Sequence, residues 1–152
     1  MSIVCISDSV RDSFGEQVLD YDEIDGSKKR YYYYKIDISL SHFALIPLRK
    51  NCKKSSDYLP ILNKQSKEHG FDFEKMLIIR KSEIVIKQSI DDFVYRDILN
   101  KEEQIGPRVF SQIQKYKNLL MKEKSGLFLS TEDHLYLERN TLQYFVNEIK
   151  HL

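Results

Sequence analysis

The spacing of hydrophobic and polar positions changes near the middle of the chain. In the first half, apolar residues form short runs or alternate with polar ones, which is typical of β-strands. Residues 3–6 form such a run before the turn-forming residues 7–9, and they predict a short buried strand. Residues 20–27 are acidic and punctuated by glycine, and they predict a loop.

The clearest alternation lies at residues 31–40, where tyrosines and isoleucines alternate with lysine, aspartate and serine. A second apolar run at residues 42–48 follows after one or two residues. The two runs predict an antiparallel hairpin that turns near residues 39–42. Residues 75–80 and 83–87 predict a second hairpin across Lys81 and Ser82.

Helical signals occupy two parts of the chain. A short helix is predicted at residues 57–68, with Asp57 as N-cap, Pro60 in the first turn and Gly70 after its end. From residue 89 onward, apolar residues recur at helical spacing and predict helices at 89–101, 107–124 and 130–151, with Pro107 in a first turn and Ser130 as a cap. Strands followed by helices predict one α+β domain spanning residues 1–152.

Several classes of protein are excluded by what the sequence lacks. No apolar run reaches the length of about 18–20 residues that a membrane span needs, and the N-terminus does not resemble a secretory signal. We therefore expect a cytoplasmic protein without a membrane partner, and free thiols at Cys5 and Cys52. The four histidines are isolated from one another and from cysteine, so we expect neither a metal ion nor a cofactor.

The formal net charge of +1 hides an uneven distribution. Residues 1–27 carry one basic residue and seven acidic ones, a net charge of −6. Residues 28–54 carry eight basic residues and one acidic one, a net charge of +7. Residues 55–152 hold fifteen of each sign, so one strongly basic block surrounds the first predicted hairpin.

The two ends of this basic block are expected to meet in space, because the start of one strand lies beside the end of the next in an antiparallel hairpin. Cations interleaved with aromatic rings suit RNA, since phosphates need positive charge and bases stack on rings. The alternative is a solvated basic edge that discourages strand-to-strand aggregation. The predicted RNA-binding residues are Lys28, Lys29, Arg30, Tyr31, Tyr33, Lys35, Lys53 and Lys54.

Candidate catalytic residues follow from the chemistry of metal-free RNA cleavage. That reaction needs a base for the 2′-hydroxyl, an acid for the leaving 5′-oxygen and cations for the phosphorane. His42 is the one side chain near the basic block that exchanges protons around neutral pH. Arg49, Lys50 and Asn51 supply the remaining chemical types. The alternative for His42 is a structural role beside a turn.

Four segments carry a resemblance to a known family: IVCIS at residues 3–7, residues 31–51, GFDFEKMLII at residues 70–79 and YRDIL at residues 95–99. In this order and spacing the chain resembles the ToxN/AbiQ superfamily of type III toxin–antitoxin endoribonucleases, nearest to its CptN or TenpN-like branches. The resemblance implies a small, strongly curved antiparallel sheet, a MazF/ToxN-like barrel, elaborated by helices. It also implies metal-independent cleavage of cellular mRNA that leaves 2′,3′-cyclic phosphate and 5′-hydroxyl ends.

The resemblance further implies a small, repeated non-coding RNA as antitoxin. The toxin would cut this RNA from its precursor and be inhibited by it as a pseudoknot, in a closed assembly of alternating protein and RNA. One departure concerns the site: relatives carry a Thr-Ser-Pro-Lys type sequence after the Pro-Leu that ends the second strand, whereas here Pro47-Leu48 is followed by Arg49-Lys50-Asn51. Catalytic roles therefore do not transfer residue by residue, and Arg30 falls about where the family has a functional lysine.

The sequence thus predicts an endoribonuclease toxin whose site lies where the hairpin base meets the N-terminal strand. A non-catalytic RNA-binding or assembly module that uses the same basic groove is the first alternative. A protein–protein adaptor is the second, and it leaves the basic block without a role.

Overall fold

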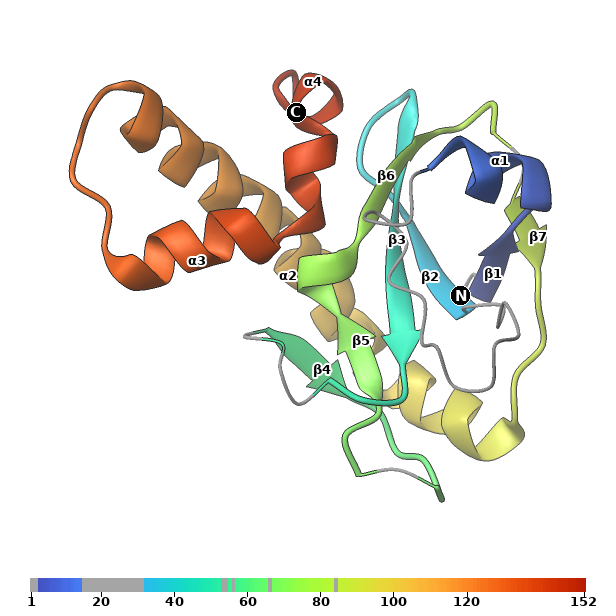
Figure 1. Cartoon of the computed structure of the whole chain (residues 1–152). Helices are drawn as coiled ribbons and strands as arrows, with labels where there is room; N and C mark the ends of the chain where they lie inside the picture. Colours follow the sequence, from blue (N-terminus) through green and yellow to red (C-terminus); the bar gives the residue numbers. More distant parts are fainter. Residues whose placement is uncertain (1–2, 15–31, 53–54, 56, 66, 84) are drawn as a thin grey trace.

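An open antiparallel sheet forms one part of the molecule and helices form the rest (Figure 1). The computed structural model describes residues 3–14, 32–52, 55, 57–65, 67–83 and 85–152. Within these residues seven strands join in the order β4-β5-β3-β2-β1-β7, and β6 also pairs with β3. The C-terminal half is mostly helical. The α+β class predicted from the sequence is therefore confirmed.

The first predicted hairpin is confirmed. β2 (Tyr32–Asp37) and β3 (His42–Arg49) pair antiparallel, from Tyr32 opposite Leu48 to Asp37 opposite Phe43. The turn is fixed by Ser39, whose Oγ accepts hydrogen bonds from the backbone N–H of Ser41 at 3.2 Å and of His42 at 3.0 Å. The strand predicted at residues 3–6 is confirmed as β1 (Ile3–Ile6), and it pairs with the other side of β2.

The prediction of a short helix at residues 57–68 is wrong. This region instead holds β4 (Tyr58–Pro60), which pairs with β5 (Gly70–Asp72). Leu59 is buried between exposed or half-buried neighbours, which is the two-residue period of a strand. Gly70 permits the close pairing, because a Cβ there would lie 2.4 Å from the carbonyl oxygen of Leu59. Asp57 caps no helix and instead pairs with Arg108 of the long helix at 3.5 Å.

The prediction that residues 75–80 and 83–87 form a hairpin is also wrong. β6 (Leu77–Arg80) pairs with β3 and β7 (Val85–Lys87) pairs with β1, so three strands separate them. The chain from Arg80 to Val85 reaches about 17 Å at most, whereas four strand spacings in a flat sheet span about 19 Å. These two pairings therefore require the sheet to curve. It is not closed into a barrel, because the described part of the chain joins β6 to β7 by a connection and not by a strand ladder.

The helices differ from the sequence prediction at three places. Residues 7–9 do not form a simple turn, because Ser7 caps the short helix α1 (Asp8–Ser13). The helices predicted at 89–101 and 107–124 are one, α2 (Asp92–Lys124), which continues through Pro107. The predicted third helix starts at its Ser130 cap, as expected, but breaks at Asn140 into α3 (Thr131–Arg139), the 3₁₀ turn η2 (Thr141–Tyr144) and α4 (Val146–Ile149).

The core lies where α2 and the C-terminal segments pack against the sheet. Gly106 lets α2 approach closely, since a Cβ there would lie 3.3 Å from Cδ1 of Ile36 on β2. A second 3₁₀ turn, η1 (Phe73–Lys75), separates β5 from β6 and packs against α2 and η2. Both cysteines are buried free thiols. Within the described residues, no helix combines the length and apolar character needed to span a bilayer. The largest fully buried side chains include Phe71, Phe73, Leu45, Ile46, Ile98, Ile105 and Leu142.

Candidate functional site

Two polar regions lie at opposite ends of the β2–β3 hairpin. We call the end where Tyr32 lies opposite Leu48, together with residues 49–51, the hairpin base. We call residues 39–42 the hairpin turn. β1 runs antiparallel to β2, with Val4 opposite Tyr33, so its carboxyl end lies at the hairpin base. The N-terminal strand and the hairpin base are thus adjacent, which is the juxtaposition that the sequence predicted.

The hairpin base holds three of the four predicted catalytic residues. Lys50 and Asn51 are exposed there. Arg49 is not: its Nη1 lies 2.7 Å from Oδ2 of Asp72, with the arginine side chain 15% exposed and the aspartate side chain 0% exposed. The second Asp72 oxygen accepts hydrogen bonds from Ser55 Oγ at 2.8 Å and the Glu74 backbone N–H at 3.0 Å. Arg49 therefore neutralises a buried carboxylate.

Of the predicted RNA-binding residues, Tyr33 and Lys35 lie in the described part of the chain. Tyr33 is 4% exposed, so its ring belongs to the core and offers no face to a base. Lys35 is half-buried, and its Nζ lies 4.6 Å from the centre of the Phe43 ring. The other six lie outside the described residues: Lys28, Lys29, Arg30, Tyr31, Lys53 and Lys54.

His42 lies far from the other predicted catalytic residues. It begins β3, and Arg49 ends the same strand. Seven residue steps at about 3.3 Å each separate the two backbones by about 23 Å. The proposed catalytic group of His42, Arg49, Lys50 and Asn51 therefore does not form one site. The geometric reason is that the turn and the base of a hairpin are its opposite ends.

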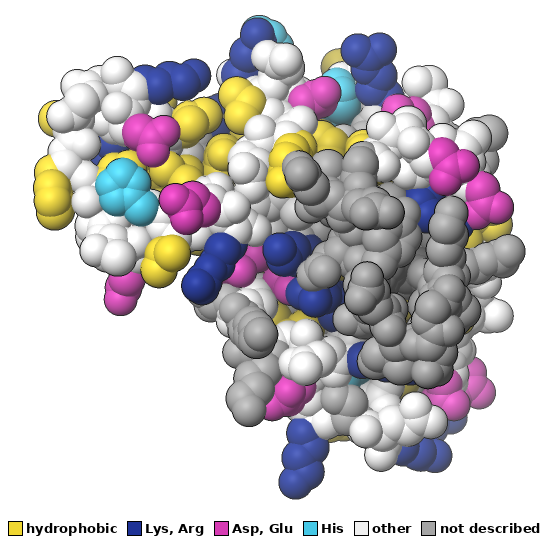
Figure 2. Space-filling model, in the orientation of Figure 1, with side chains coloured by type: hydrophobic (Ala, Val, Ile, Leu, Met, Phe, Trp, Pro, Cys, Tyr) yellow, Lys and Arg dark blue, Asp and Glu magenta, His cyan; other side chains and the backbone are white. Residues whose placement is uncertain are grey.

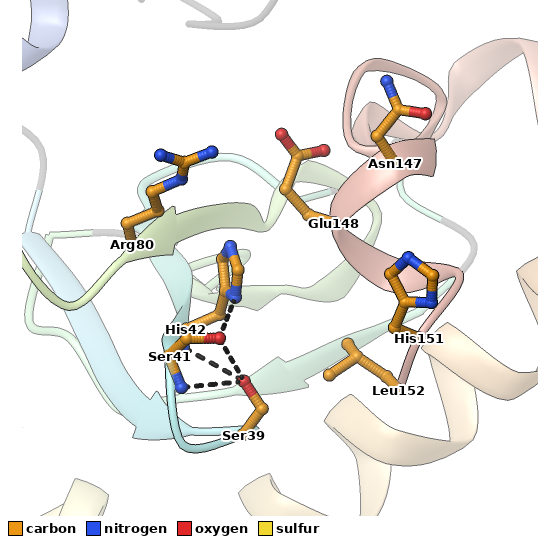
Figure 3. A pocket seen from close by; sticks show the side chains of 8 residues that line it. All are labelled: Ser39, Ser41, His42, Arg80, Asn147, Glu148, His151 and Leu152. Carbon is orange, nitrogen blue, oxygen red and sulfur yellow. Dashed lines mark hydrogen bonds between the residues drawn. The ribbon is translucent and has the colours of Figure 1, made fainter.

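His42 instead lines a pocket of about 320 Å³ at the hairpin turn (Figure 3). Arg80 on β6 lies directly opposite His42 in the sheet register and lines the same pocket. Sequence reasoning missed this arrangement, because no local signal links the turn to residues so distant in the chain. The remaining lining residues are Ser39, Ser41, Asn147, Glu148, His151 and Leu152.

A second tyrosine of the hairpin connects it to α2. Tyr34 Oη donates a hydrogen bond of 2.6 Å to Oε1 of Glu102. Burial, and then the neighbouring Glu102 carboxylate, raise the pKa of Tyr34 above its ordinary value. Tyr34 thus remains a protonated donor across the physiological range and holds the hairpin against the helix.

Charges on the molecular face in Figure 2 are mixed in sign. Lysine and arginine side chains lie beside acidic ones in the hollow between α3 and the β4–β5 pair. The Arg108–Asp57 pair at 3.5 Å joins α2 to the residue before β4. Among the described residues, no group of three or more histidine, cysteine or acidic side chains is placed to hold a metal ion. No family model, no curated protein and no solved structure matches the chain.

Proposed function

We propose that this protein is the endoribonuclease toxin of a type III toxin–antitoxin system. It cleaves cellular mRNA without a metal ion, by attack of the 2′-hydroxyl on the adjacent phosphate, and leaves 2′,3′-cyclic phosphate and 5′-hydroxyl ends. A small repeated RNA, folded as a pseudoknot, is its antitoxin and forms a closed assembly with it in the cytoplasm. The MazF/ToxN-like relationship is part of this proposal.

The observation that supports it best is the meeting of β1 with the hairpin base. The exposed Lys50 and Asn51 lie at the strand ends there, within the basic block of residues 28–54. Exposed cations at an edge of a sheet suit the phosphates of a single-stranded RNA. Lys50 follows β3 directly, and Lys53 and Lys54 come three and four residues later in the sequence.

The test is incubation of the purified protein with total cellular RNA in excess EDTA. We expect discrete fragments whose 5′ ends accept phosphate from a polynucleotide kinase without prior dephosphorylation. Absence of cleavage, or fragments with 5′-phosphate ends, would contradict the proposal. Short tandem repeats upstream of the coding sequence, followed by a terminator, are the expected genomic counterpart.

A non-catalytic RNA-binding module is the second candidate, and one observation favours it. At the hairpin base, Arg49 is engaged by Asp72, and His42 lies about 23 Å away along β3. His69 lies next to Gly70, the partner of Arg49, but it is buried and its Nδ1 donates to the Ile61 carbonyl oxygen. The described residues of the base therefore offer a cation, Lys50, without an accessible histidine. This candidate predicts tight, salt-sensitive RNA binding and no product in the same assay.

A further inference from the structure

The pocket at the hairpin turn gathers the side chains that metal-free RNA cleavage requires. His42 comes from β3, Arg80 from β6, Glu148 from α4, and His151 from the residues just after α4 (Figure 3). Two imidazoles and a guanidinium thus face one open space of about 320 Å³. That volume lies at the lower end of the range of about 300–1,000 Å³ typical of ligand sites.

The ring of His42 is oriented by the hairpin turn itself. Its Nδ1 lies 2.8 Å from Oγ of Ser41, and Ser39 holds the turn that presents Ser41. Its Nε2 is buried and has no hydrogen-bond partner among the described residues. With either tautomer, Nε2 is left as a donor or an acceptor without a partner. A buried polar atom without a partner is costly, and a ligand that supplies one recovers that cost.

The opposite wall of the pocket is held by core packing. Ile149 is buried between Glu148 and His151 in the sequence, and Phe145 is buried just before α4. Phe145 also meets Phe14 edge-on, with ring centres 5.9 Å apart. Residues three apart in a helical turn lie on the same side, so Glu148 and His151 both face the pocket. The wall is therefore fixed relative to the sheet.

Other charged groups of the hairpin lie on the opposite face of the sheet. Phe43 follows His42 in β3, and adjacent residues of a strand point to opposite faces. Lys35 and Lys81 lie over the Phe43 ring, at 4.6 Å and 5.6 Å from its centre, and Lys81 pairs with Asp37. Among the described residues, the charged or titratable side chains that line the pocket with His42 are those of Arg80, Glu148 and His151.

We infer that this pocket binds the scissile phosphodiester of RNA and that His42 and His151 transfer the protons of its cleavage. This inference rests on the proposed function and moves its chemistry from the hairpin base to the hairpin turn. Arg80 is assigned to the non-bridging phosphate oxygens, because a guanidinium can donate two parallel hydrogen bonds to them. The basic block at the hairpin base then holds the flanking RNA.

The step needs no other reactant. One imidazole takes the proton of the 2′-hydroxyl, and the 2′-oxygen forms a bond to phosphorus. The bond between phosphorus and the 5′-oxygen breaks, and the leaving oxygen takes a proton from the other, protonated imidazole. The products are a 2′,3′-cyclic phosphate and a 5′-hydroxyl, and proton exchange with water restores both rings.

The experiment compares RNA cleavage in EDTA by the wild-type chain and the variants His42→Ala, His151→Ala and His134→Ala. His134 is the matched control, because it lies on α3 with a side chain 55% exposed and outside the pocket. Loss of a general acid or base typically lowers the rate by about 10²–10⁴-fold, so we expect that loss for His42→Ala and His151→Ala. We expect His134→Ala to retain the wild-type rate within about two-fold.

The pH dependence of the rate separates proton transfer from a structural role. The wild-type profile should be bell-shaped, and each pocket variant should lose one limb of the bell. Circular dichroism checks that each variant folds, and His42→Asn and His151→Asn replace any alanine variant that does not. If a folded His42 or His151 variant cleaves RNA at the wild-type rate, this inference is overturned and the proposed function stands. Absence of cleavage by the wild-type chain overturns the proposed function itself.

Discussion

The two ends of β3 carry similar polar side chains in different physical situations. At the hairpin base, Arg49 is bound by the buried carboxylate of Asp72 and serves the fold. At the hairpin turn, His42 and Arg80 line an open pocket, and the Arg80 side chain is exposed. The density of charge along the sequence therefore does not reveal which charges are free to act. The partner of each cation inside the fold decides that.

The sheet register explains the difference. β5 pairs with the last residues of β3, with Gly70 opposite Arg49, and brings Asp72 within reach of the guanidinium. A buried carboxylate needs a cation or several hydrogen bonds to offset its lost hydration. At the other end of β3, β6 supplies Arg80, an exposed cation, in place of a buried acid. The same strand is thus structural at one end and open at the other.

The largest expected effect is a loss of stability at the hairpin base. Arg49→Ala leaves the Asp72 carboxylate buried without its cation, and we expect the free energy of unfolding to fall by about 3–5 kcal/mol. Arg80→Ala at the opposite end is the control, and its exposed side chain should change stability by about 0.5 kcal/mol or less. Urea denaturation measures both variants. Equal stability of the two would show that the Arg49–Asp72 pair does not support the fold.

A second prediction concerns the close approach of β4 and β5 beside the base. Gly70→Ala places a Cβ 2.4 Å from the carbonyl oxygen of Leu59, and we expect a loss of about 1–3 kcal/mol from overpacking. Gly106→Ala is the matched control, because its Cβ would meet the movable end of Ile36 at 3.3 Å. Thermal unfolding should rank Gly70→Ala well below Gly106→Ala, and a reversed order would contradict this packing.

A third prediction tests the role of Lys50, the exposed lysine at the base. Lys50→Ala should weaken RNA binding and reduce the slope of log affinity against log salt concentration by about 0.7, the value for one phosphate contact on a single strand. Lys122→Ala, an exposed lysine in the last turn of α2, should leave the slope unchanged. Fluorescence anisotropy with a labelled RNA at several salt concentrations measures both. An unchanged slope for Lys50→Ala would remove this residue from the RNA contact.

The smallest expected effect is a pH dependence of stability near the base. His69, just before β5, is buried and donates a hydrogen bond of 3.1 Å from Nδ1 to the Ile61 carbonyl oxygen. Burial lowers its pKa below the ordinary value of 6.5. The unfolded chain therefore binds this proton first, so stability is complete above pH 6.5 and is lost as pH falls toward the lowered pKa. Urea midpoints between pH 7.5 and pH 5 should fall less in His69→Gln than in the wild type.

Local patterns predicted those parts of the fold that local residues determine. The alternation before Ser39 predicted β2, the apolar run after it predicted β3, and Ser130 marked the start of α3. The region of Asp57 and Pro60 has the local signature of a helix start, but pairing with β5 favours an extended chain. β6 and β7 are close in sequence, yet each pairs with an earlier strand, and no local pattern specifies such distant pairing.

Of the candidate site, too, the sequence could predict only what does not depend on distant parts of the chain. His42 was identified by its chemical type alone, which needs no knowledge of the fold. Its neighbours in the pocket could not be identified, because Arg80 reaches it through the strand register and His151 through the packing of the C-terminal segment. The ion pair of Arg49 could not be predicted for the same reason, since its partner Asp72 lies on another strand.

The proposal that the hairpin turn cleaves RNA and the hairpin base binds it is tested most directly with His42→Ala and Lys50→Ala. Single-turnover cleavage and RNA affinity are measured separately for each variant. We predict that His42→Ala cleaves bound RNA about 10²–10⁴-fold more slowly and keeps its affinity within about three-fold. The loss in Lys50→Ala should lie mainly in affinity. A His42→Ala enzyme that cleaves bound RNA at the wild-type rate would contradict the account.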